Sequence, residues 1–320
     1  MNLPRLSLLL LVASTLAAQP PPPAPAPAKP AEKKSGESQW VFSLLPKSLQ
    51  KNPRLELTVI TEMTEAGKKR PPVSPAQPAY FVTQSGGFRQ LGHAPGNEKS
   101  LSPAQVEKIL THALAANGYL PAQPPARAPT LAIMFVWGSH NLLVEGDDEN
   151  PSLSGQAVAR NLLDRAALVG GEKFARQMLD LFTQADALST AASVPVAPDG
   201  QAVIGQAQLD FMNPVNQFKL LSAKNEFLVD QAAADVYYVV ASAYDYASLA
   251  RKERVLLWRT RMTVAAQGVS QEQTLPTLIA SAAPFLGKEM AEPEILSKRA
   301  VREGTVEVGV PTVVEPPQPK

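Results

Sequence analysis

Apolar residues recur at helical spacing in SPAQVEKILTHALAANGYLP (residues 102–121), which is the clearest predicted element of the chain. Ser102 is a good N-cap, Pro103 suits the first helical position, and Gln105 can complete a capping box. Gly118 can adopt the left-handed conformation that ends a helix. The pattern therefore predicts a capped helix with one core-facing stripe, formed by Val106, Ile109, Leu110, Ala113 and Leu114.

Strand patterns occur on both sides of this helix. In TLAIMFVW (residues 130–137) only Thr130 is polar. An antiparallel strand with one wet face would alternate, so this run predicts an interior strand that is covered on both faces. RLELTVITEM (residues 54–63) and AYFVTQ (residues 79–84) predict two earlier strands.

The second half of the chain combines further helices with a hairpin. Apolar residues at helical spacing before and after Gly170 and Gly171 predict two consecutive helices. Asn213 and Pro214 open another helix, whose predicted apolar face holds Phe218, Leu221, Leu228 and Ala232. VYYVVASAYDY (236–246) and RVLLWRTRMTV (254–264) then predict an antiparallel pair of strands.

The end of the chain is expected to hold one more helix and one more strand. Ser270 and Gln273 predict a second capping box, for a last helix bent or broken at Pro276 and Pro284. GTVEVGV (residues 304–310) could add an edge strand. Together these elements predict an α+β fold with a mixed or largely antiparallel sheet covered by helices. We expect one domain over residues 40–300, and a C-terminal strand or tail with a proline-rich end over residues 301–320.

The N-terminal residues have the pattern of a signal peptide. Thirteen uncharged residues from Leu6 to Ala18 follow Arg5 and end in small residues. A membrane-spanning helix needs about 20 apolar residues, so this run is too short to span. We expect residues 1–18 to be removed, which predicts a periplasmic or secreted protein without a transmembrane segment in the mature chain. Residues 19–39 predict an extended proline- and alanine-rich spacer.

Composition excludes several function classes. Thirty basic and twenty-nine acidic residues leave a formal net charge of +1, which gives no global field for nucleic acid. The chain has no cysteine, so thiol catalysis, thiolate metal sites and disulfides are excluded. Stability must therefore come from the core, and we expect neither a metal nor another cofactor.

Three predicted elements carry a family resemblance: the capped helix, the buried strand TLAIMFVW and the late hairpin. The helix ends in Gly118 and Tyr119, and the late hairpin places Asp245 shortly before a strand with Trp258 and Arg259. In this order the chain resembles a group of exported bacterial cell-envelope domains of unknown function. The resemblance implies an α+β envelope domain and no particular activity. Many of those domains are lipoproteins, whereas this chain lacks the cysteine that lipid attachment needs.

Candidate chemistry concentrates around one histidine. His140 follows the buried strand and precedes the acidic loop that holds Asp147 and Asp148. Aspartate can orient an imidazole as a general base near neutral pH, so these three residues are the candidate catalytic set. The alternative is a solvated loop leading into a helix N-terminus, where carboxylates are favoured.

A second candidate is a binding site on the hairpin. Arg259 and Arg261 share the strand face opposite Trp258, where they could bind an anion or pair with Asp245 across the hairpin. No P-loop, nucleophile elbow, dinucleotide fingerprint or zinc-protease motif occurs in the sequence.

These observations favour an exported, non-enzymatic cell-envelope protein with a binding or accessory role and envelope protein partners. One alternative is an enzyme with an unfamiliar site near His140, Asp147 and Asp148. Another is a scaffold that binds other chains through its proline-rich segments, since preformed polyproline II docks onto aromatic grooves.

Overall fold

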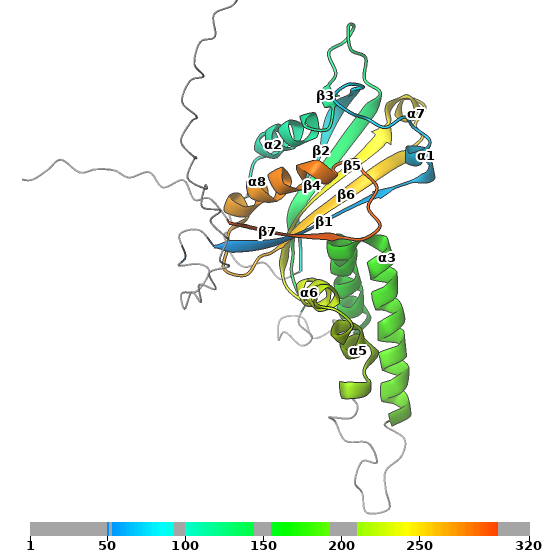
Figure 1. The fold of residues 1–320 in the computed structure, drawn as a ribbon, viewed down its shortest axis with the longest axis vertical. Coiled ribbons are helices and arrows are strands. Elements are labelled where there is room, and N and C mark those ends of the chain that lie inside the picture. The colour runs from blue at the N-terminus through cyan, green and yellow to red at the C-terminus, as the bar shows by residue number, and fades with distance from the viewer. Residues whose placement is uncertain (1–49, 51–52, 93–99, 144–154, 193–209, 300–320) are drawn as a thin grey trace, which may run out of the picture. The chain divides into compact units, whose positions relative to one another are not determined.

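Seven strands form one mixed sheet in the order β3-β2-β4-β5-β6-β1-β7 (Figure 1). The computed structural model describes residue 50 and residues 53–92, 100–143, 155–192 and 210–299. β2 runs parallel to β3 and β4, and the other neighbouring strands are antiparallel. The sheet curls into half a barrel, which confirms the predicted mixed α+β fold. The strands are β1 (Arg54–Met63), β2 (Ala79–Leu91), β3 (Tyr119–Pro121), β4 (Leu131–His140), β5 (Val236–Asp245), β6 (Leu256–Ala265) and β7 (Glu294–Arg299).

Helices connect and cover these strands. α2 begins with the predicted capping box, in which Ser102 and Gln105 satisfy each other's backbone N–H groups. The second predicted capping box is wrong, because the Ser270 side chain makes no capping hydrogen bond, and its carbonyl accepts bonds from Thr274 instead. The helices are α1 (Glu65–Lys68), α2 (Pro103–Ala115), α3 (Gly155–Ala192), α5 (Pro214–Leu220), α6 (Ala223–Ala232), α7 (Tyr246–Ala250), α8 (Gln271–Ala282) and the 3-10 helix η2 (Ala283–Phe285).

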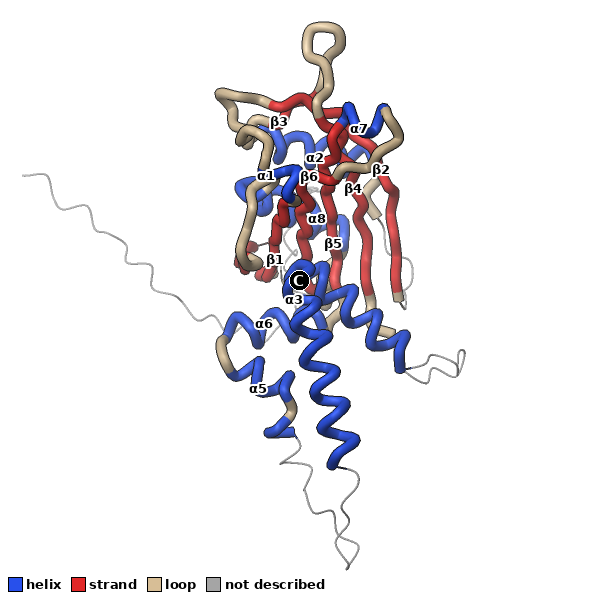
Figure 2. The backbone as a smooth tube through the Cα atoms, turned by 90° about the vertical axis from the view of Figure 1, so that its right-hand side faces the viewer, coloured by secondary structure: helices blue, strands red, loops and turns tan. Residues whose placement is uncertain are grey.

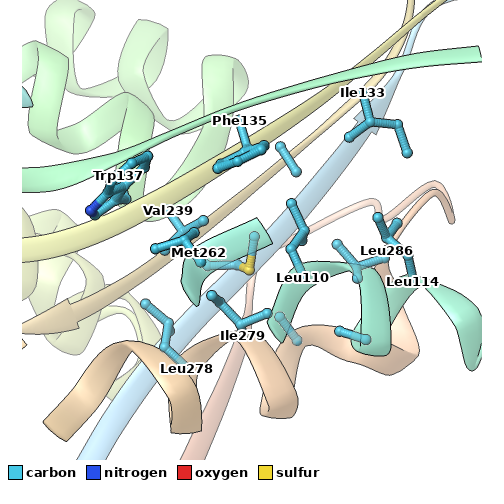
Figure 3. Packing of buried hydrophobic residues seen from close by; sticks show 14 of the residues in the cluster. Leu110, Leu114, Ile133, Phe135, Trp137, Val239, Met262, Leu278, Ile279 and Leu286 are labelled. Atoms are coloured by element: carbon cyan, nitrogen blue, oxygen red, sulfur yellow. The ribbon is translucent and has the colours of Figure 1, made fainter. Parts of the chain in front are cut away.

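The main core lies between the sheet and the helix pair α2 and α8. In Figure 3, Leu110 of α2 and Ile279 of α8 point toward Met262 of β6, and all three side chains are buried. Phe135 and Trp137 of β4 stack in the same core, with ring centroids 5.8 Å apart. The apolar stripe predicted for the first helix thus faces the sheet.

The opposite face of β4 is less covered than its apolar sequence predicts. β4 is an interior strand, paired with β2 and β5. On the face turned away from α2 and α8, Met134 and Val136 remain half-buried. The position of the long helix α3 accounts for this difference, because α3 packs against β1 and β6, which lie further along the sheet from β4.

Helices α3, α5 and α6 form a second core beside the sheet (Figure 2). Its buried members include Phe174 and Phe218, whose ring centroids lie 6.4 Å apart. α3 is interrupted at Gly171, which has φ 81° and ψ −177°, so the two predicted consecutive helices are confirmed. A side chain at Gly171 would be strained by this φ and would also meet the Glu62 carboxylate.

The single helix predicted from Asn213 onward is two helices. Asn213 caps α5, and the Ser222 hydroxyl accepts a hydrogen bond from Asn225 N to begin α6. Leu221 lies between the two helices and is 76% exposed, so it does not belong to the predicted apolar face. The apolar periodicity continues through this region, but the helix does not, because Ser222 caps a new helix there.

The late hairpin is confirmed as the antiparallel pair β5 and β6, and its connector holds the short helix α7. β7 was not predicted from the sequence, although it pairs with β1 along the sheet edge. The predicted strand at residues 304–310, the leader at residues 1–18, the spacer at residues 19–39 and the tail at residues 301–320 lie outside the described residues.

Candidate functional site

A cavity of about 720 Å³ lies at the end of the sheet near α1 and β3. Its roof belongs to a proline-rich loop (residues 69–78) that joins α1 to β2 and crosses this end of the sheet (Figure 1). Within the loop, Ser74 and Gln77 exchange two backbone hydrogen bonds of 3.0 and 3.1 Å. The lining is mainly apolar and includes Met63, Val73, Leu131, Leu257 and Trp258. A concave, mostly apolar cavity of this size is typical of a small-molecule site.

Gly118 lies directly against the roof of the cavity. Its φ is +87°, and a Cβ atom at this position would lie 2.2 Å from the carbonyl carbon and oxygen of Ser74. Both the backbone conformation and the space therefore require glycine here. The glycine that ends α2 thus also allows the proline-rich loop to pack closely.

Tyr119 and Trp258 form the aromatic part of the cavity wall. Their ring centroids are 5.7 Å apart in an edge-to-face arrangement, and both residues are buried. The Tyr119 hydroxyl lies against Gly287, where a Cβ atom would come within 2.0 Å of it. Burial raises the pKa of Tyr119 to about 12, so its hydroxyl stays neutral at physiological pH.

Asp245 anchors the base of the proline-rich loop. It caps α7 by accepting hydrogen bonds from Ser248 N (2.8 Å) and Ser248 Oγ (2.6 Å), and it forms an ion pair with Arg70. The bond from the Ser248 hydroxyl is the main cause of its lowered pKa, and Arg70 adds to it. Of the five residues that carry the family resemblance, Tyr119 and Trp258 line this cavity, and Gly118 and Asp245 contact its proline-rich loop through Ser74 and Arg70.

Arg259 and Arg261 lie elsewhere, on the face of β6 that packs against α3. The predicted pairing of these arginines with Asp245 is wrong, because Arg261 pairs with Glu62 and Glu172, and Asp245 pairs with Arg70. Arg259 donates to Ser242 Oγ at 3.2 Å. Glu62 also accepts a hydrogen bond from Glu172 N at 2.8 Å, so a strand carboxylate caps the second part of α3.

His140 ends β4 and is 98% buried, since its relative exposure is 2%. It lines a cavity of about 390 Å³ together with Arg160, Asn161 and Asp164. Its Nδ1 atom has no hydrogen-bond partner among the described residues. Burial and, after it, the charge of Arg165 lower the pKa of His140 to about 4. A base with this pKa is a weak proton acceptor at neutral pH.

Asp147 and Asp148 lie outside the described residues, so their convergence with His140 stays a prediction. Within the described ranges, no group of three or more histidine, cysteine, aspartate and glutamate side chains could hold a metal ion. The described helices also include none that is both long and apolar enough to cross a membrane.

Burial of neutral His140 predicts a loss of stability in mild acid. The unfolded chain takes up a proton near pH 6.5, whereas the folded chain keeps His140 neutral down to about pH 4. The contribution of neutral His140 to the free energy of unfolding is therefore fully present above about pH 6.5, and it is lost as the pH falls toward 4. Between pH 7 and pH 5 we expect this residue to lower the free energy of unfolding by about 2 kcal/mol.

Urea unfolding of the wild type and of His140→Gln at both pH values measures this contribution. The variant should lose less stability than the wild type on acidification. His112→Gln is the matched control, because His112 is exposed on α2. An equal pH dependence in the wild type and in His140→Gln would show that His140 does not titrate as described.

The sequence did not indicate the cationic residues at the cavity. Lys68, Arg70 and Lys288 all contribute to its lining, although they are distant in the sequence. The only sequence signal was the proline-punctuated run KKRPP between two predicted strands, which is typical of a surface turn. Comparison of the chain with protein-family models and with curated proteins finds no match.

Proposed function

We propose that this protein is an exported, non-enzymatic cell-envelope protein that binds a small apolar or amphipathic ligand in the cavity beneath the proline-rich loop. The observation that carries the proposal is the cavity itself, about 720 Å³ in volume and lined mainly by apolar side chains. The leader-like residues 1–18 support export, and the resemblance to envelope domains agrees with that location.

The lining of this cavity supports binding more than catalysis. Among the described residues, the ionisable side chains of the lining besides Tyr119 are Lys68, Arg70 and Lys288, with no histidine, aspartate, glutamate or serine. A general base of suitable pKa is therefore missing from its wall. The alternative site at His140 has a buried imidazole of low pKa, which also disfavours acid–base chemistry near pH 7.

The scaffold alternative rests on proline-rich segments that lie outside the described residues. In this alternative the proline-rich segments would bind to aromatic grooves on partner chains, so the cavity described above would have no part in it. Ligand binding inside the cavity is accordingly the function that the geometry supports best.

Calorimetric titration with 1-dodecanol tests the proposal on protein made from the full chain in a bacterial host. We expect saturable binding with one site per chain and a negative heat-capacity change, because apolar surface is buried. Val73→Trp should weaken this binding at least about tenfold, since the larger side chain would fill the cavity from its roof. The mass of the same preparation should lack residues 1–18.

Val82→Trp is the matched control, because Val82 lies on β2 outside this cavity and is 37% exposed. It should bind dodecanol as the wild type does. Absence of saturable binding to the wild type, or equal binding by both tryptophan variants, would contradict a ligand site in this cavity. An intact leader on the purified chain would contradict export.

A further inference from the structure

The charged side chains that line the cavity are all cationic. The part of the chain that the structure describes contributes three cationic side chains to this lining, Lys68, Arg70 and Lys288, and no carboxylate. These cations come from α1, from the proline-rich loop and from the turn after η2, and all three are exposed. The cavity thus combines an apolar, partly aromatic wall with cationic groups that water can reach.

Two of the three cations already have carboxylate partners. Arg70 pairs with Asp245, and Lys68 lies 3.4 Å from Glu65 and 3.5 Å from Glu289. The described residues provide no ion-pair partner for Lys288. Its backbone is fixed by a 3.2 Å hydrogen bond from Lys288 N to Phe285 O, next to the close contact of Gly287 with Tyr119. The backbone of Lys288 is therefore held beside the cavity, and its ammonium group has no ion-pair partner within the described ranges.

We propose that the ligand of this cavity is an amphipathic anion, a hydrocarbon chain that ends in a carboxylate. The hydrocarbon lies against Val73, Leu257 and Trp258, and the carboxylate binds Lys288. This inference rests on the proposed function, because it names the ligand class of the same cavity. Charge complementarity decides between ligand classes. A neutral apolar molecule makes no ion pair with Lys288, and a cationic amphiphile is repelled by it.

Three probes with the same hydrocarbon chain length and different head groups distinguish the contribution of the head group to the affinity from that of the hydrocarbon. Dodecanoate, 1-dodecanol and dodecyltrimethylammonium are titrated calorimetrically into the full chain at pH 8, below the concentrations at which they form micelles. Dodecanoate should bind at least about tenfold more tightly than dodecanol, because a charge-assisted hydrogen bond is added. The ammonium probe should bind most weakly.

Lys288→Gln should lose about tenfold of the affinity for dodecanoate. The matched control is Lys298→Gln, since Lys298 is an exposed lysine on β7 that does not line the cavity. It should leave the affinity for dodecanoate unchanged. The advantage of dodecanoate over dodecanol should also shrink in high salt, because these cations are solvent-exposed.

The outcomes distinguish this inference from the function on which it rests. Equal binding of dodecanoate and dodecanol, tightest binding of the ammonium probe, or equal effects of the two lysine variants would overturn the anionic ligand while the cavity still binds hydrocarbon. Failure of all three probes to bind would contradict the proposed function, and this inference with it.

Discussion

An Arg261→Met variant should unfold with a free energy about 3 kcal/mol lower than that of the wild type. The guanidinium is 5% exposed and forms ion pairs with both Glu62 and Glu172. Methionine keeps most of the apolar stem but removes the charge that these two carboxylates share. Glu62 then loses its ion-pair partner, and Glu172 keeps only the more distant Arg259 at 4.0 Å, at the junction between β1, β6 and α3.

Arg259→Met is the matched control on the same strand face. Arg259 is 34% exposed, and its Nη1 lies 4.0 Å from Glu172, so the same substitution should cost less than about 1 kcal/mol. Urea unfolding followed by circular dichroism measures both variants. Similar losses in the two variants would mean that the Arg261 ion pairs do not hold the sheet against α3.

Gly118→Ala should destabilise the fold by about 2–5 kcal/mol. The left-handed conformation costs about 1–2 kcal/mol for a residue with a Cβ atom, and overpacking adds about 1–3 kcal/mol. The overpacking arises because the new methyl group would lie 2.2 Å from backbone atoms of Ser74. Since Ser74 belongs to the proline-rich loop, whose neighbouring residue Val73 lines the cavity, the variant should also bind dodecanol more weakly than the wild type.

Gly87→Ala separates these two contributions. Gly87 has a similar φ of +82°, but nothing lies within 4 Å of its would-be Cβ atom. It should therefore lose only the conformational cost of about 1–2 kcal/mol and keep the ligand affinity of the wild type. Thermal and urea unfolding give the stabilities. A loss at Gly118 no greater than that at Gly87 would exclude the predicted contact with Ser74.

Local patterns predicted the regular elements because those patterns depend on near neighbours in the chain. Ser102, Gln105 and Gly118 mark the ends of α2, and Gly171 marks the break in α3, through backbone chemistry that acts over a few residues. The helix predicted through Leu221 failed for a related reason. Its periodicity hid a second cap at Ser222.

Contacts between distant segments could not be read from the same patterns. Asp245 is paired with Arg70, which is 175 residues away, and Arg261 is paired with Glu62, which is 199 residues away. The alternation of side chains along a strand correctly predicted that Arg259 and Arg261 lie on one face of β6. It could not identify their partners, because strand order decides which charges meet. The cavity is likewise assembled from distant segments: β1, α1, the proline-rich loop, β2, β3, β4, β6 and the segment after η2.

The proline-rich loop affects the kinetics and the entropy of any binding event beneath it. Four of its ten residues are prolines (Pro71, Pro72, Pro75 and Pro78), and each has a fixed φ angle. The roof therefore has few alternative conformations before a ligand binds, so binding costs little conformational entropy of this loop. A preorganised roof of this kind favours rapid association of a ligand with a preformed cavity over slow closure of the loop around the ligand.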